Sequence, residues 1–128
     1  MCFTYDEYPE MFAMATVKIR KDQVCAACST KIERGQLATA NSGKFDGHMF
    51  YYHVCGACEL TTYRIHLHEI EEGCHWSTSW ISPNDLHQYC RDTEFEISAK
   101  AEGQRFCAWK RQADKLRKES KRANLLHG

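Results

Sequence analysis

The alternation of apolar and polar residues, with the turn formers between them, predicts three short strands in the first half of the chain. Residues 16–20 read Thr-Val-Lys-Ile-Arg, which has the period of a strand. Residues 36–40 and 48–54 flank a run of turn formers over residues 41–47, so they are expected to pair as antiparallel strands across that loop. Further upstream, proline at position 9 favours the start of a short helix.

The apolar spacing becomes helical after residue 55. Leu60, Tyr63, Leu67 and Ile70 recur at intervals of three, four and three residues, which is one apolar stripe of a helix. Gly73 suits the position just beyond a helix end, because glycine accepts the left-handed conformation there. We expect a helix in this segment that packs through that stripe.

A second helix start stands at residues 82–85, which read Ser-Pro-Asn-Asp. Serine suits the N-cap, proline the first helical position, and an acid stands three residues after the cap. This predicts a short helix over residues 83–91 with Leu86 and Tyr89 facing inward. Residues 93–98 alternate acidic and apolar side chains, and both a strand and a connector fit them.

From residue 99 the pattern is helical again. Phe106, Trp109, Ala113 and Leu116 fall on one narrow stripe at spacings of three and four residues. Around this stripe are the basic side chains of Lys110, Arg111, Lys115, Arg117, Lys118, Lys121 and Arg122. The tail is therefore predicted to be a basic amphipathic helix.

Charge is segregated along the chain although its sum is zero. There are 17 basic and 17 acidic side chains, but seven acids stand between residues 68 and 97 against Arg91 alone. The acidic middle suits a partner with a basic surface. The basic tail, with Trp109 beside it, suits either phosphate binding or docking on protein, and the sequence leaves both readings open.

Two Cys-x-x-Cys pairs, Cys25/Cys28 and Cys55/Cys58, are separated by 26 residues. Four thiolates are the tetrahedral ligand set that structural Zn²⁺ prefers. Each pair by itself also fits a thioredoxin-like redox motif, but the doubled motif favours zinc. The chain opens with no basic, apolar leader and contains no run long enough to span a membrane, so we expect a reducing cytoplasmic setting in which cysteines bind metal.

The order of a cysteine turn, a hairpin and a helix that carries the second cysteine pair is typical of a treble-clef zinc module. The expected fold class is α+β, with a zinc-binding domain over residues 1–98 and the basic helix over residues 99–128. A chain of this size gains stability from such a metal site, because metal binding contributes directly to folding.

Other cysteines and histidines offer further metal sites. His53, two residues before Cys55, is an alternative ligand, although a hydrogen bond to a thiolate or carbonyl suits it better. A second zinc set would use Cys74, His75, His87 and Cys90, whose spacing fits no standard finger; buried cysteines are the simpler interpretation.

The motifs around the cysteines resemble those of small zinc-binding proteins encoded by bacteriophages and prophages. The similarity lies in residues 20–28 (RKDQVCAAC), 32–36 (IERGQ), 43–47 (GKFDG) and 54–58 (VCGAC), and extends over about residues 8–89. It implies that Cys25, Cys28, Cys55 and Cys58 are the metal ligands and that the protein acts inside a phage-infected cell. It implies no activity.

Three functions remain in view. We favour a non-enzymatic binding module that modulates a host or phage macromolecule, with a protein partner engaged through acidic and aromatic surfaces and a host nucleic-acid-binding or defence system as the candidate target. The alternative is a nucleic-acid-binding accessory factor that uses the basic helix. A His-Asn-His-type nuclease would use Asp46, His48 and His53 together with His66 and His68 of the helix. Its Asp-His dipeptide is, however, interrupted by Gly47, and no Asn lies between His48 and Cys58.

Overall fold

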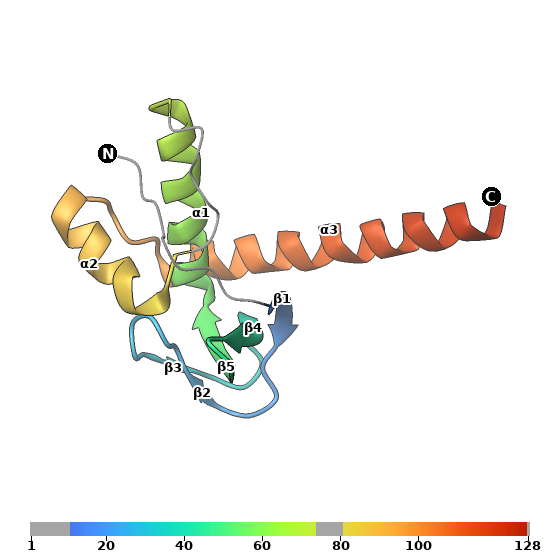
Figure 1. The fold of residues 1–128 in the computed structure, drawn as a ribbon, viewed down its shortest axis with the longest axis horizontal. Helices are drawn as coiled ribbons and strands as arrows, with labels where there is room; N and C mark the ends of the chain where they lie inside the picture. Colours follow the sequence, from blue (N-terminus) through green and yellow to red (C-terminus); the bar gives the residue numbers. More distant parts are fainter. Residues whose placement is uncertain (1–10, 74–80, 128) are drawn as a thin grey trace.

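The computed structural model describes residues 11–73 and 81–127, which form an α+β body and one long projecting helix (Figure 1). A three-stranded antiparallel sheet has the order β1-β4-β5, and a two-stranded sheet pairs β2 with β3. The strands are β1 Met11–Lys18, β2 Gln23–Val24, β3 Lys31–Ile32, β4 Leu37–Phe45 and β5 His48–Cys55. The helices are α1 Gly56–Glu71, α2 Pro83–Thr93 and α3 Lys100–His127. The α+β class is as predicted.

No helix within the described ranges is both long and apolar enough to cross a membrane.

Strand β1 is longer than the sequence pattern predicted. It pairs with β4 along its whole length, from Met11 opposite Lys44 to Lys18 opposite Leu37. The short helix expected to start at Pro9 does not extend into residues 11–18, because the ladder with β4 satisfies the backbone of this segment as a strand. Pro9 lies outside the described residues.

The β4–β5 hairpin also extends through the predicted loop. Residues 41–45 continue β4, and the chain reverses only at Asp46 and Gly47, with Phe45 opposite His48. Asp46 and Gly47 have φ angles of 48° and 78°. Positive φ at both central residues is the tight turn that matches strand twist, and Asp-Gly is a preferred sequence for it. The turn formers at positions 41–43 indicated a loop, but β4 pairs with β1 on one side and with β5 on the other. This pairing outweighs the turn propensity of the three residues.

Helix α1 packs through a different face from the predicted stripe. Leu60 is buried, but Tyr63, Leu67 and Ile70 are substantially exposed, and Ile65 is the apolar residue fully enclosed in the core. Glu69 is only 2% exposed, and its Oε1 accepts a hydrogen bond from the Tyr89 hydroxyl at 3.2 Å. The predicted apolar stripe is not the buried face of α1, because α2 covers the face that carries the Glu69 carboxyl group.

Helix α2 follows the prediction closely. Pro83 is its first residue and Ser82 its N-cap, and Leu86 and Tyr89 are buried against the body. Residues 95–99 form no regular structure, so this segment is a connector. The core that α2 completes consists of Ile19, Cys25, Ile32, Ala38, Val54, Cys58, Ile65, Ile81, Leu86, Tyr89 and Cys90.

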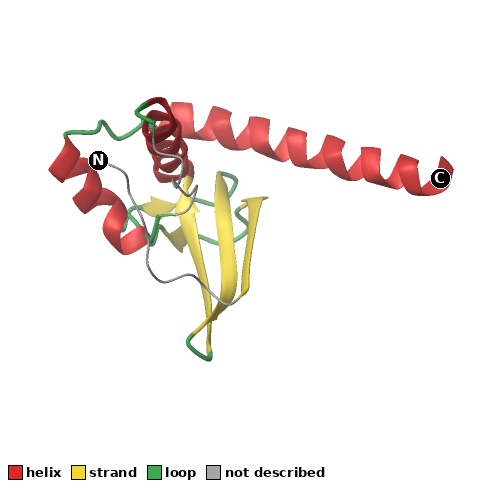
Figure 2. Cartoon of the chain, turned by 45° about the horizontal axis from the view of Figure 1, so that its top comes forward, coloured by secondary structure: helices red, strands yellow, loops and turns green. Residues whose placement is uncertain are grey.

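Helix α3 contacts the body only through its first half (Figures 1 and 2). Gly103 and Cys107 are buried against α1, and the Gln104 amide pairs with the Leu37 backbone through two hydrogen bonds of 2.8 Å. Every residue from position 115 to 125 is exposed. The apolar stripe of this helix is therefore not buried against the body as a whole: Trp109 is 60% and Leu116 55% exposed.

Candidate metal centre

The four cysteines of the two Cys-x-x-Cys pairs come together at one point of the fold. Cys25 and Cys28 lie on the turn between β2 and β3, Cys55 ends β5, and Cys58 is in the first turn of α1. Their sulfur atoms all lie within 4.8 Å of one another. Cys25 is 0% and Cys58 1% exposed. The grouping inferred from the paired spacing is confirmed, and these residues could hold a metal ion.

Backbone hydrogen bonds fix the turn that carries the first pair. The Ser29 N–H donates to the Cys25 carbonyl and the Cys25 N–H to the Thr30 carbonyl, both at 2.9 Å. Ser29 has a φ of 62°, which lets the chain reverse after Cys28. The Ala26 N–H donates to the His53 carbonyl at 2.9 Å, so the turn is held against the end of β5.

The second pair is placed where strand β5 becomes helix α1. Cys55 keeps an extended conformation as the N-cap of α1, with φ −66° and ψ 159°. Its N–H donates to the Cys25 sulfur at 3.3 Å, and its own sulfur lies 3.8 Å from that of Cys28. The helix dipole also favours negative charge at this end of α1.

The electrostatics of the cluster favour a thiolate at Cys25 and oppose ionisation of Cys55 and Cys58. Hydrogen bonds from the Cys55 and Cys58 thiols hold the pKa of Cys25 far below its ordinary value. The hydrogen bond with Cys25 raises the pKa of Cys55 to about 12, and hydrogen bonds with Cys25 and Cys55, with burial, raise that of Cys58 further. A cation bound among the sulfurs would offset the repulsion between neighbouring thiolates, so that all four cysteines could ionise.

A histidine from α2 completes the surroundings of the cluster. His87 Nε2 lies 3.5 Å from the Cys58 sulfur, so an Nε2–H tautomer would donate a hydrogen bond to the thiolate. Such contacts stabilise metal ligands and fix their orientation. The sequence offered no signal for this pair, because His87 is 29 residues from Cys58 and reaches it only through the packing of α2.

His53 is not among the clustered donors. Its side chain is nearly buried, burial lowers its pKa, and its Nε2 lies 3.3 Å from the Tyr51 hydroxyl. Its contact with the cysteine turn is made by its backbone carbonyl.

Only two of the four residues of the predicted second metal site, His87 and Cys90, lie among the described residues. Cys74 and His75 lie outside the described residues. His87 is engaged with Cys58, and Cys90 is buried in the core, where desolvation raises its pKa. The second zinc site stays a prediction.

The residues considered for a nuclease are separated in the fold. Asp46 and His48 are exposed at the hairpin turn, and His53 lies near the other end of β5. Within residues 11–73 and 81–127, the four cysteines are the only group of three or more His, Cys, Asp or Glu side chains placed to share a metal ion.

The basic side chains of α3 have three kinds of surroundings: ion pairs, hollows beside the sheet, and solvent. Lys110 is paired with Glu59 at 3.4 Å and lies over the Phe106 ring, and Arg117 is paired with Asp114 at 2.7 Å. Arg111, Lys115 and Lys118 line hollows between α3 and the sheet. Lys121 and Arg122 are exposed beyond the body.

No protein-family model matches the chain, and no curated protein or solved structure is significantly similar to it.

Proposed function

We propose that the four-cysteine cluster is a structural zinc site in a treble-clef module, and that the protein is a non-enzymatic binding module built on it. Four sulfur donors within 4.8 Å of one another support zinc, because thiolates favour soft or borderline ions and a tetrahedral set suits Zn²⁺. The order of cysteine turn, β4–β5 hairpin and α1 supports the treble-clef assignment.

A structural role follows from the number and burial of the donors. With four protein ligands, a tetrahedral zinc has no open position for water or substrate. Two of the four, Cys25 and Cys58, are fully enclosed in the core, so the ion would join the β2–β3 turn to the start of α1. In this proposal the metal holds the fold and takes no part in chemistry.

A protein-binding role is supported by a group of aromatic and apolar side chains on and beside α3 that are exposed or half-buried. Trp109 stacks on Phe106, with ring centroids 6.0 Å apart, and Phe106 contacts Tyr63 at 5.1 Å. Met14 completes the lining of a hollow of about 240 Å³ at this place. We call Met14, Tyr63, Phe106 and Trp109 the aromatic patch.

Aromatic side chains in such a setting are typical anchors of protein interfaces, since they bury a large area with little loss of side-chain freedom. The acidic middle segment adds a second feature, because Glu71, Glu72, Asp92, Glu94 and Glu96 are exposed around the ends of α1 and α2. A protein partner that is basic around an apolar centre would match both. The resemblance to phage proteins extends this proposal to a host target, such as a nucleic-acid-binding or defence protein.

The test is a nuclease-treated pull-down from a bacterial lysate with the zinc-loaded protein and its Trp109→Ala variant. We expect a specific protein to be retained by the unchanged protein and lost with Trp109→Ala. Met49→Ala, which removes an exposed apolar side chain near the hairpin turn, is the matched control and should keep the partner. Equal retention by both variants would exclude the aromatic patch as the binding surface.

A further inference from the structure

A large hollow with a basic lining opens between β1, the loop that follows it and α3. Its volume is about 1040 Å³, and none of its lining residues is Asp or Glu. Five of them are cations that come from three separate parts of the chain: Lys18, Arg20, Lys21, Arg34 and Arg111. The fold thus concentrates positive charge that is dispersed in the sequence.

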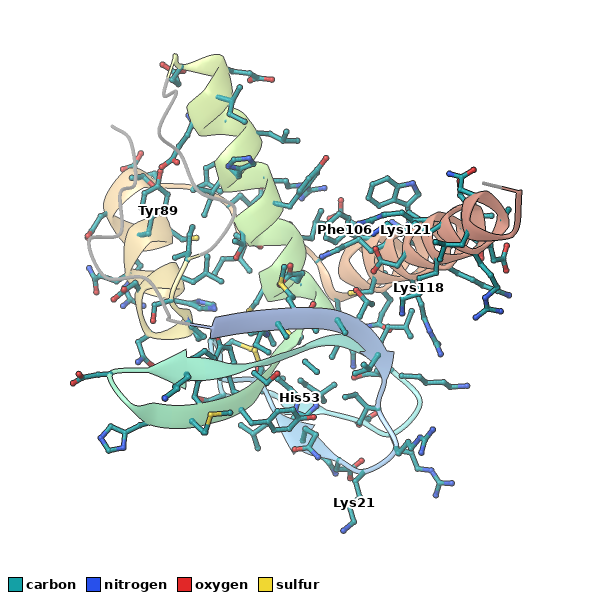
Figure 3. The ribbon with its side chains drawn as sticks, turned by 45° about the vertical axis from the view of Figure 1, so that its right-hand side comes forward. Lys21, His53, Tyr89, Phe106, Lys118 and Lys121 are labelled. Atoms are coloured by element: carbon teal, nitrogen blue, oxygen red, sulfur yellow. The ribbon has the colours of Figure 1, made fainter. Side chains whose placement is uncertain are left out.

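The hollow continues along α3. A neighbouring depression of about 570 Å³ shares Thr16 and Arg111 with it and adds Lys115 and Lys118. Lys21 stands on the loop after β1 and Lys118 on the projecting part of α3 (Figure 3). We call the two hollows together, with their seven cations, the basic cleft.

None of the side-chain ion pairs among the described residues uses one of these seven cations. Two acids near the cleft, Asp22 and Asp114, are engaged with other groups, and Asp114 itself lines the second hollow. Asp22 is paired with Lys31 at 3.0 Å and accepts the Arg34 N–H at 2.9 Å, and Asp114 is paired with Arg117. The cleft therefore has an excess of positive charge, with seven cations against one paired acid in its lining, which favours a polyanion.

An exposed aromatic ring lies in the same cleft. Tyr51 is 68% exposed, yet its ring is positioned by His53, which meets it edge-on at 5.1 Å between centroids and bonds its hydroxyl at 3.3 Å. A held aromatic ring within a basic groove is the arrangement on which unpaired bases stack. A duplex would offer phosphates to the cations but no free base face to Tyr51.

We propose that the basic cleft binds single-stranded nucleic acid, with phosphates along its cations and a base stacked on Tyr51. Arg111, Lys115 and Lys118 recur at four and three residues, so they share one flank of α3 over about 10 Å. The cleft gathers cations from β1 and the loop after it, the β3–β4 turn and α3. The proposed binding surface is therefore larger than the basic helix that the sequence indicated.

This inference goes beyond the proposed protein-binding role and uses another surface. The aromatic patch lies on the flank of α3 that faces Glu59 and Tyr63, whereas the basic cleft lies on the flank that faces Thr16 and Leu37. The two proposals share the zinc-held fold and no binding residue. Trp109→Ala should therefore leave nucleic-acid binding unchanged, and changes in the cleft should leave protein retention unchanged.

The experiment is a fluorescence anisotropy titration of zinc-loaded protein with labelled single-stranded DNA, single-stranded RNA and duplex DNA over a range of salt concentrations. We expect single strands to bind more tightly than duplex, with affinity falling as salt rises, and the two single-stranded arms tell RNA from DNA. The triple variant Arg20→Gln, Lys21→Gln, Arg34→Gln should reduce the slope of log affinity against log salt by about 2, at about 0.7 for each lost phosphate contact. Tyr51→Ala should lower single-strand affinity about ten-fold or more.

The matched control is Lys44→Gln, Lys100→Gln, Arg105→Gln, which removes the same charge outside the cleft. Zinc content and circular dichroism establish that each variant is folded. Equal losses in the cleft and control triples would overturn the proposal, because binding would then follow net charge alone. Duplex binding as tight as single-strand binding, with no effect of Tyr51→Ala, would also overturn it, as would the absence of binding at low salt.

Discussion

Gly103 of α3 lies directly against the backbone of Gly56 at the start of α1. A Cβ on Gly56 would stand 2.7 Å from the Gly103 carbonyl oxygen, and a Cβ on Gly103 would overlap the Gly56 carbonyl carbon and the Ala57 nitrogen. Gly56 itself follows Cys55, so this contact joins the projecting helix to the four-cysteine cluster. The absence of both side chains permits the approach.

The first prediction concerns this contact. In an isolated helix, Gly103→Ala would be stabilising by about 1 kcal/mol. Here the new methyl group meets backbone atoms that have no rotamer to change, so we expect the variant to lose about 3 kcal/mol in the free energy of unfolding. Urea unfolding followed by circular dichroism measures the change, and Ala101→Gly, at an exposed position of the same helix, is the control. A stabilised Gly103→Ala protein would show that the helices do not approach so closely.

Removal of the metal should unfold the body. A structural zinc supplies about 10 kcal/mol or more of apparent binding free energy, which is comparable to the whole stability of a small domain. We expect a strong chelator to abolish the strand signal in circular dichroism and to collapse the chemical-shift dispersion of the amide protons in NMR. Cys58→Ser should behave like the chelated protein, whereas Cys90→Ala should keep its metal. An unchanged spectrum after verified loss of zinc would exclude the structural role.

Metal affinity should fall as the pH is lowered. In the metal-free cluster the pKa of Cys55 is raised to about 12 and that of Cys58 is higher still, so both thiols carry protons at neutral pH. Cys25, whose pKa is lowered, is already a thiolate there. Zinc binding thus releases at least two protons, and affinity should change more than ten-fold per pH unit between about pH 6 and 8. Competition with a chelator of known affinity measures this slope, and a flat profile would argue against thiolate ligation.

His87 should strengthen metal binding without being a ligand. Because its Nε2 lies 3.5 Å from the Cys58 sulfur, its loss would remove one hydrogen bond from a thiolate. We expect His87→Ala to weaken zinc affinity by about ten-fold with unchanged stoichiometry. His87→Gln, which keeps a donor, should recover part of the loss, and His48→Ala at the exposed hairpin turn should have no effect. A loss of one zinc per chain would instead make His87 a ligand of a second site.

The helix α1 shows most clearly why part of the fold escaped prediction. Its existence, its start at the second cysteine pair and its end before Gly73 all followed from local signals, and Gly73 has the expected positive φ of 87°. Its buried face did not follow, because Glu69 is a charged residue that no periodicity rule places inside. The Tyr89 hydroxyl on α2 makes that burial tolerable, and residues 20 apart in the chain carry no local signature of such a pair.

The sequence by itself determined the four-cysteine grouping and the type of most elements. The paired cysteine spacing indicates a metal site from the chemistry of thiolates alone, and Ser82-Pro83 indicates a helix start from local backbone geometry alone. Both could therefore be predicted without knowledge of the fold. Only the tertiary structure decided what surrounds them: the Cys58–His87 contact, the Gly56–Gly103 approach and the convergence of Arg20, Arg34 and Arg111 on one cleft. These relationships join residues that are far apart in the chain, and they arise from packing, which local propensity does not encode.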